Sequence, residues 1–150
     1  MPTTSPKPLV LIVEDHPDTQ SVVAEAFEEN GYETVVAFDG DMGLAIVRER
    51  HPALVCLDLN LPRISGHDVC ERIREDPSLQ DVAILMMSAG RTPETHAHAL
   101  EAGADMYLPK PFDTEALLAA AKELTAARKG RREAPEDELT DLELAGVAVS

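Results

Sequence analysis

Short apolar runs alternate with helix-like segments along this chain, and the alternation limits the possible folds more than any other feature. The strand-like runs cover residues 8–13, 34–37, 53–57, 82–87 and 105–108. Between them, apolar residues recur at helical spacing. Chains with this pattern form a parallel sheet with helices on both of its faces. We therefore expect one α/β domain over residues 8–127, preceded by a tail of residues 1–7.

Reactive side chains stand where several of these runs end. The first run leads into Glu14 and Asp15, the third into Asp58, the fourth into Ser88, and the fifth, through Pro109, into Lys110. In an open parallel sheet, ligands bind at the carboxyl ends of the strands, so we expect these side chains to converge. Carboxylates, a hydroxyl and an ammonium in one place indicate phosphate chemistry around a hard cation.

Composition excludes several functional classes. The chain has 150 residues, of which 44% are hydrophobic, and its formal net charge is −15. Such an excess of negative charge argues against direct binding to nucleic acid or to an anionic membrane surface. We find no apolar stretch long enough to span a bilayer and no apolar signal-peptide core near the N-terminus, so we expect a cytoplasmic protein without membrane insertion.

The expected helices each have a side that should face the sheet. Their starts are expected at Pro17, Asp39, Ser65, Thr92 and Asp113. Their inward residues are expected to be Val22, Val23, Ala26 and Phe27; Leu44, Ala45 and Val47; Val69, Cys70 and Ile73; Ala97 and Leu100; and Leu117, Leu118, Ala121 and Leu124. The fourth helix, which Gly103 should end, offers little apolar area, so we expect it to be among the less stable elements.

Thiols and imidazoles give no separate site by spacing alone. Cys56 and Cys70 fit buried, reduced thiols, since neither belongs to a metal-binding or redox motif. The histidines lie on different expected loops and helices without a shared ligand geometry, and a zinc site is not expected. They are His16, His51, His67, His96 and His98, of which the last two should point to different faces of one helix.

The composition changes after the fifth helix. A basic cluster covers residues 128–132, and residues 133–143 are mostly acidic. We expect residues 128–150 to form a charged, flexible tail. The alternative is a short docking peptide built on Leu139, Leu142 and Leu144.

An aspartate can attack a phosphoryl group and hold it as an acyl phosphate, but this brings two anions together. Mg²⁺ solves the problem, because it takes oxygen ligands from carboxylates, water and phosphate; Mn²⁺ is a possible substitute. Asp15 and Asp58 are expected as direct ligands, Glu14 as a ligand through water, and Asn60 through its backbone carbonyl. Without the cation, repulsion between the acids should raise at least one carboxyl pKa.

Lys110 and Ser88 complete the expected site. Lys110 supplies a point charge for the phosphoryl oxygens, and Ser88 offers a hydroxyl donor to another of them. Ala89, the next residue, is small enough to leave room for the phosphoryl group.

At these positions the chain resembles the receiver domain of two-component response regulators. The matching segments are Val13–Asp15, Leu57–Pro62, Met87–Ala89, Gly103–Asp105 and Tyr107–Phe112. The resemblance implies a flavodoxin-like, doubly wound parallel sheet of five strands in the order 2-1-3-4-5, with five helices. Strands one and three would then be neighbours, which places Glu14 and Asp15 beside Asp58.

The resemblance also implies a mechanism. Asp58 would take a phosphoryl group from a histidine kinase or a histidine phosphotransfer protein and later lose it to water. Ser88 and Tyr107 would form the switch, and the Lys110–Pro111 bond would be cis. The residue pattern alone favours the interpretation of Tyr107 as an ordinary half-buried strand residue. Two positions depart from common family patterns: Glu14 replaces an aspartate, and Gly90 replaces a polar residue.

Competing interpretations fit the residues less well. A phosphatase of the haloacid dehalogenase type would need an acid two residues after Asp58, where Asn60 stands. A flavin or nucleotide module would need a phosphate loop after the first strand, where an acidic segment stands. A receiver-like protein that only binds partners would not need the complete set of site residues. We expect a stand-alone response regulator, not an enzyme, that signals to an unidentified downstream protein; a phosphorelay shuttle is the alternative.

Overall fold

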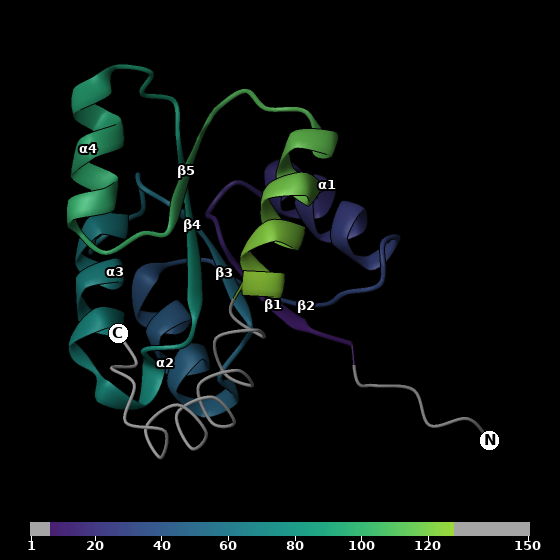
Figure 1. Ribbon diagram of the computed structural model, residues 1–150, viewed down its shortest axis with the longest axis horizontal. Helices are drawn as coiled ribbons and strands as arrows, with labels where there is room; N and C mark the ends of the chain where they lie inside the picture. Colours follow the sequence, from purple (N-terminus) through teal and green to yellow (C-terminus); the bar gives the residue numbers. More distant parts are fainter. Residues whose placement is uncertain (1–6, 128–150) are drawn as a thin grey trace, which may run out of the picture.

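A five-stranded parallel sheet lies between two layers of helices in the computed structural model, which describes residues 7–127 (Figure 1). The strands follow the order β2-β1-β3-β4-β5, which confirms the predicted doubly wound arrangement. Their bounds are Leu9–Val13 for β1, Glu33–Ala37 for β2, Leu54–Asp58 for β3, Ala83–Ser88 for β4 and Met106–Pro109 for β5. Every pair of neighbouring strands is parallel, so all their carboxyl ends meet at one edge.

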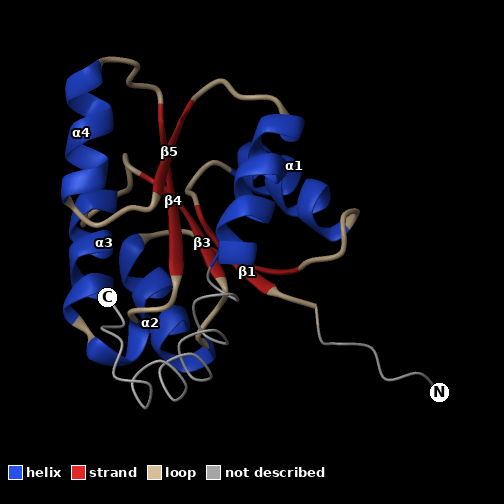
Figure 2. Ribbon diagram, in the orientation of Figure 1, coloured by secondary structure: helices blue, strands red, loops and turns tan. Residues whose placement is uncertain are grey.

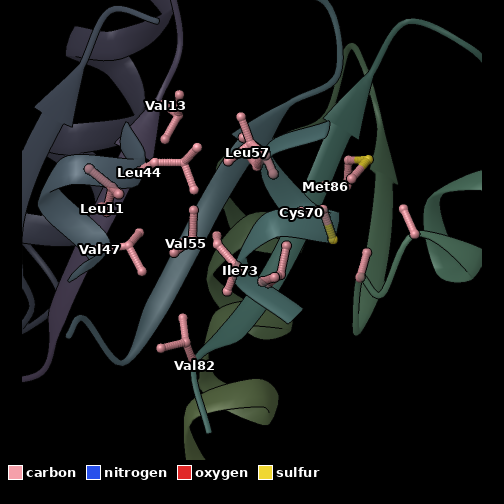
Figure 3. Packing of buried hydrophobic residues seen from close by; sticks show 14 of the residues in the cluster. Leu11, Val13, Leu44, Val47, Val55, Leu57, Cys70, Ile73, Val82 and Met86 are labelled. Atoms are coloured by element: carbon pink, nitrogen blue, oxygen red, sulfur yellow. The ribbon is translucent and has the colours of Figure 1, made fainter. Parts of the chain in front are cut away.

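The central strands are buried on both faces because their side chains alternate between two cores. Leu11 and Val55 point into one core, while Ile12 and Cys56 point into the other. Figure 3 shows the first core, in which strand residues pack against Leu44, Val47, Cys70 and Ile73 from the helices. Each fully buried leucine or isoleucine stabilises the fold by roughly 1.5–3 kcal/mol relative to an exposed one.

The helices divide between the two faces of the sheet (Figure 2). Three helices cover the first core: α2 (Gly40–Arg50), α3 (Gly66–Glu75) and α4 (Pro93–Glu101). The second core is covered by α1 (Pro17–Glu28) and the helical residues 114–127. A 3₁₀ turn, Pro77–Leu79, precedes β4. The capping residues Asp39, Ser65, Thr92 and Asp113 each accept a hydrogen bond from a backbone N–H three residues later, as predicted.

Some of the predicted helix faces were wrong by one position. Val22 is 55% exposed, and Ala45 is also exposed. In α4, Ala97 and Leu100 are exposed, whereas Ala99 is fully buried. Adjacent residues differ by about 100° around a helix, and a small residue lets α4 approach β5 closely, so packing decided the rotation.

One arginine fastens the end of α3 to the region between α4 and β5. The Arg74 guanidinium donates to the carbonyls of Gly103, at 2.9 Å, and Val82, at 2.8 Å, and to the Asp105 carboxylate, at 2.7 Å. Gly103 ends α4 with a φ of 112°, a conformation that favours glycine.

Within the described range, no helix is long and apolar enough to cross a membrane. The expected tail after residue 127 and its alternative docking peptide around Leu139 lie outside the described residues, as does most of the tail expected before residue 8.

Candidate functional site

Three strand ends bring Glu14, Asp58 and Lys110 together. Because β1 and β3 are neighbours, the carboxylates that follow or end these strands lie side by side. The Lys110 side chain extends from the end of β5 past β4 to reach both. Its Nζ lies 2.9 Å from Oε1 of Glu14 and 3.3 Å from Oδ2 of Asp58. The sequence predicted this convergence on one site.

The two carboxylates are buried where the ammonium meets them. Glu14 has no exposed surface and Asp58 is only 4% exposed, whereas the Lys110 side chain keeps 26% of its surface exposed. A buried carboxylate without a partner is strongly unfavourable, so Lys110 compensates both acids from the solvent side.

The pKa shifts follow from this packing. Burial raises the pKa of Glu14, and the negative charge of Asp58 adds to the rise, against the hydrogen bonds from Lys110 and the backbone of His16. The sequence predicted a raised carboxyl pKa through repulsion between the acids; the larger cause is burial. Burial lowers the pKa of Lys110, but the partners Glu14 and Asp58 outweigh it, so its pKa is raised.

Asp15 lies on a more exposed side of the cluster. Its Oδ1 is 3.5 Å from Nδ1 of His16, which is also 3.8 Å from Oε2 of Glu14. The ligand atoms of these three residues all lie within 4.8 Å of one another, so they can meet one cation. The sequence predicted Asp15 as part of the site but no ligand geometry for His16, although the position of His16 next to the acidic pair was an available signal.

The loop after β3 holds Asp58 in place. Oδ1 of Asp58 accepts a hydrogen bond from the backbone N–H of Asn60, at 3.1 Å. The N–H of Gly66 donates to the carbonyl of Leu59, at 2.9 Å. A Cβ at Gly66 would lie 2.4 Å from the Asp58 carbonyl oxygen and 2.7 Å from Cα of Leu59, so only glycine fits here.

Ser88 and Tyr107 meet at the loop after β4. The N–H of Gly90 donates to Oγ of Ser88, at 3.1 Å, and the Tyr107 hydroxyl donates to the Gly90 carbonyl, at 2.5 Å. Both side chains are buried, and the ring of His96 covers Tyr107 at a centroid distance of 5.5 Å.

The Lys110–Pro111 bond is cis, as the resemblance implied. Two supporting side chains were missed by the sequence analysis, because their partners are backbone carbonyls that a pattern does not reveal. Gln20 donates to the carbonyl of Glu14, and Arg91 donates to the carbonyl of Lys110, at 2.9 Å.

An apolar pocket of about 500 Å³ lies beside Lys110. It opens between the start of α1 and the segment that follows β5. Its lining residues are Asp18, Thr19, Val22, Val23, Ala89, Lys110, Pro111 and Phe112.

Residues 10–122 match the response regulator receiver domain family. The DNA-binding dual master transcriptional regulator RpaA of Synechocystis is 38% identical over 117 residues, which are 78% of this chain and 48% of that protein. The phosphate regulon transcriptional regulatory protein PhoB of Pseudomonas aeruginosa is 33% identical over 138 residues, which are 92% of this chain and 58% of that protein. The chain spans about half the length of these curated relatives.

Solved structures show the same similarity. A putative response regulator from Chloroflexus aurantiacus superposes with a TM-score of 0.77 at 30% identity, covering 80% of this chain and 98% of that one. A CheY-like receiver domain protein from Methanospirillum hungatei superposes with a TM-score of 0.78 at 26% identity, covering 83% and 98%.

Proposed function

Because this chain belongs to the response regulator receiver domain family, a family of signalling switches phosphorylated on an aspartate, we propose that Asp58 is the phosphorylated residue. The observation that carries the proposal is the joint contact of Lys110 with Asp58 and Glu14 at the carboxyl edge of the sheet. We propose residues 8–127 as the receiver domain. A histidine kinase or a histidine phosphotransfer protein is the proposed phosphodonor.

In the proposed transfer, a carboxylate oxygen of Asp58 attacks the phosphorus of the partner's phosphohistidine. The new O–P bond forms as the P–N bond breaks. The electron pair of the broken P–N bond stays on the imidazole nitrogen, which takes up a proton. Lys110 offsets the charge on the phosphoryl oxygens. In the later loss, water attacks the phosphorus, the O–P bond to Asp58 breaks, and Asp58 leaves as a carboxylate.

The donor set at this edge fits Mg²⁺, with Mn²⁺ as a substitute. We propose Asp15 and Asp58 as direct ligands, Glu14 as a ligand through water, and the Asn60 carbonyl as a further oxygen. Three carboxylates with one ammonium leave the site with excess negative charge, which suits a divalent cation. When bound, Mg²⁺ supplies positive charge that lets the acids accept another anion. His16, whose nitrogen suits softer metals, is not needed for this set.

The proposed switch joins Ser88 to Tyr107. Both side chains bond Gly90, so a change in the Ser88 contact moves the same loop that holds the Tyr107 hydroxyl. We propose that Ser88 donates to the phosphoryl group and that the surface around α4 and β5 then contacts the downstream protein. The apolar pocket beside Lys110 offers a contact surface for the phosphodonor.

The proposed output is a contact between this receiver domain and another protein rather than direct binding of the domain to DNA. The net charge of −15 supports this, although the names of RpaA and other relatives describe DNA-binding proteins.

The test uses acetyl phosphate as a small phosphodonor, with and without Mg²⁺. We expect one phosphoryl group per wild-type chain only when Mg²⁺ is present, and none on the Asp58→Asn variant. Asp68→Asn, which removes an exposed carboxylate on α3, is the matched control and should behave as wild type. Equal labelling of Asp58→Asn and wild type would refute the proposal.

A further inference from the structure

Two imidazoles from different helices lie together at the seam between α3 and α4. His67, in the first turn of α3, and His98, in the last turn of α4, have ring centroids 6.2 Å apart and planes inclined at 76°. The sequence predicted no shared ligand geometry for the histidines, and the contact between these two rings could not be seen from their spacing. His96, on another face of α4, contacts Tyr107 instead, as its spacing from His98 predicted.

The His67 ring also has an unsatisfied atom. Among residues 7–127, its Nε2 is the one buried side-chain nitrogen or oxygen without a hydrogen-bond partner. A buried polar atom of this kind is unfavourable unless a ligand, ion or water meets it. His98 is exposed, so one ring of the pair is open to solvent.

We propose that His67 and His98 bind a transition-metal ion of the Zn²⁺ class and so tie α4 to α3. Imidazole nitrogen is a preferred ligand of zinc, copper and nickel. Two imidazoles on one tetrahedral zinc have ring centres about 5 Å apart, since each Zn–N bond is about 2 Å. The observed 6.2 Å therefore needs a closure of about 1 Å, which rotation of the exposed His98 side chain supplies.

Water completes the coordination, because no carboxylate among residues 7–127 joins both imidazoles in a group of ligand atoms within 4.8 Å of one another. The net charge of −15 favours the approach of a divalent cation.

The consequence falls on the most weakly packed helix. In α4, only Ala99 is buried, and Arg74 reaches the chain just after this helix, at Gly103. An ion held by both histidines adds a second link along the same seam. Because the ion binds the folded arrangement, it stabilises α4 against local opening.

Hydrogen exchange on the full chain tests the inference, with saturating Mg²⁺ to occupy the acidic site and Zn²⁺ as the probe. We expect Zn²⁺ to slow exchange in residues 93–101 of wild type and of the control His96→Ala, but not of His98→Ala or His67→Ala. Since His98 is exposed, its replacement leaves the fold intact and carries the test alone if His67→Ala fails to fold. The affinity for Zn²⁺ should fall roughly tenfold or more in His98→Ala. Loss of a residue that only hydrogen-bonds to a metal ligand already lowers metal affinity by about tenfold, and loss of a ligand should cost no less.

Two results would overturn the inference. One is Zn²⁺ binding and slowed exchange in His98→Ala equal to those of wild type. The other is loss of the effect in His16→Ala but not in His98→Ala, which would assign the ion to the acidic site. Asp58→Asn should keep the zinc effect, so the inference stands or falls separately from phosphorylation.

Discussion

Replacing Gly66 by alanine should destabilise the protein, against the usual effect of such a change. At a helix start without left-handed backbone, Gly→Ala ordinarily stabilises by about 0.4–1 kcal/mol, because alanine restricts the unfolded chain. Here the new Cβ would lie 2.4 Å from the Asp58 carbonyl oxygen and 2.7 Å from Cα of Leu59. Both contacts are backbone atoms, so the chain that carries Asp58 has to move.

The magnitude follows from the size of the overlap. Overpacking that shifts backbone destabilises by about 1–3 kcal/mol, which exceeds the entropic gain and leaves a net loss of about 1–2 kcal/mol. With a urea m-value of about 1.5 kcal/mol/M, the unfolding midpoint should fall by about 1 M. The same shift displaces the Asp58 carboxylate, so phosphorylation by acetyl phosphate should slow by about tenfold or more.

Urea unfolding at equilibrium measures the first effect, with Gly90→Ala as the matched control. The three atoms nearest to a Cβ at Gly90 all belong to the Thr95 side chain. Its Cγ2 and Oγ1, at 2.7 and 2.8 Å, can rotate away, and its Cβ, at 3.2 Å, needs only a small shift, so this variant should lose less stability than Gly66→Ala. An unfolding midpoint for Gly66→Ala equal to or above that of wild type would refute the reasoning from close approach.

The other predictions concern charge, thiols and the α3 tether. Because the pKa of Glu14 is raised, the folded protein keeps a proton on Glu14 at pH values above 4.5, where the unfolded chain has released it. The free energy of unfolding should therefore fall as the pH rises through the folded pKa. Urea titrations without Mg²⁺ should show this fall in wild type and not in Glu14→Gln. Lys110→Ala removes the ammonium that faces the two buried carboxylates. Without Mg²⁺ it should lower the free energy of unfolding by about 1–2 kcal/mol, less than for a fully buried ion pair because Lys110 is partly exposed. The rise in melting temperature on adding Mg²⁺ should be larger in this variant than in wild type. Burial raises the pKa of both Cys56 and Cys70, the latter to about 12, so a thiol reagent at pH 8 should modify them only at the rate of unfolding; fast labelling of native protein would contradict their burial. Arg74→Ala should lower the free energy of unfolding by about 2–3 kcal/mol in chemical denaturation, because three hydrogen bonds are lost. Arg74→Lys keeps the charge but not the several N–H donors of the guanidinium, so it should recover less than half of the lost stability.

The strands and the convergence of Glu14, Asp58 and Lys110 could be predicted from sequence because local signals agree there. Apolar runs fix the central strands, the alternation of elements fixes a parallel sheet, and strand ends carry the reactive groups. Helix starts were equally clear, since Asp39 and Ser65 mark them by capping chemistry.

Features set by packing between distant segments could not be predicted. Val22 and Val23 have the same side chain, and only packing against the sheet decides which one is buried. The Arg91 contact and the pairing of His67 with His98 join residues that lie 19 or more positions apart, and no sequence period links them. A raised pKa was predicted for at least one of the three carboxyl groups and assigned to repulsion. That burial is the larger cause at Glu14 could not be predicted, because the complete burial of its side chain depends on the finished fold.

The most direct measurement identifies which residue carries the phosphoryl group. Phosphorylated protein is reduced with borohydride, which converts an aspartyl phosphate to homoserine, and its peptides are sequenced by mass spectrometry. Homoserine is expected at position 58 in samples that contained Mg²⁺ and not in samples without it. Homoserine at another position, or phosphate on a histidine or serine with Asp58 unchanged, would contradict this expectation.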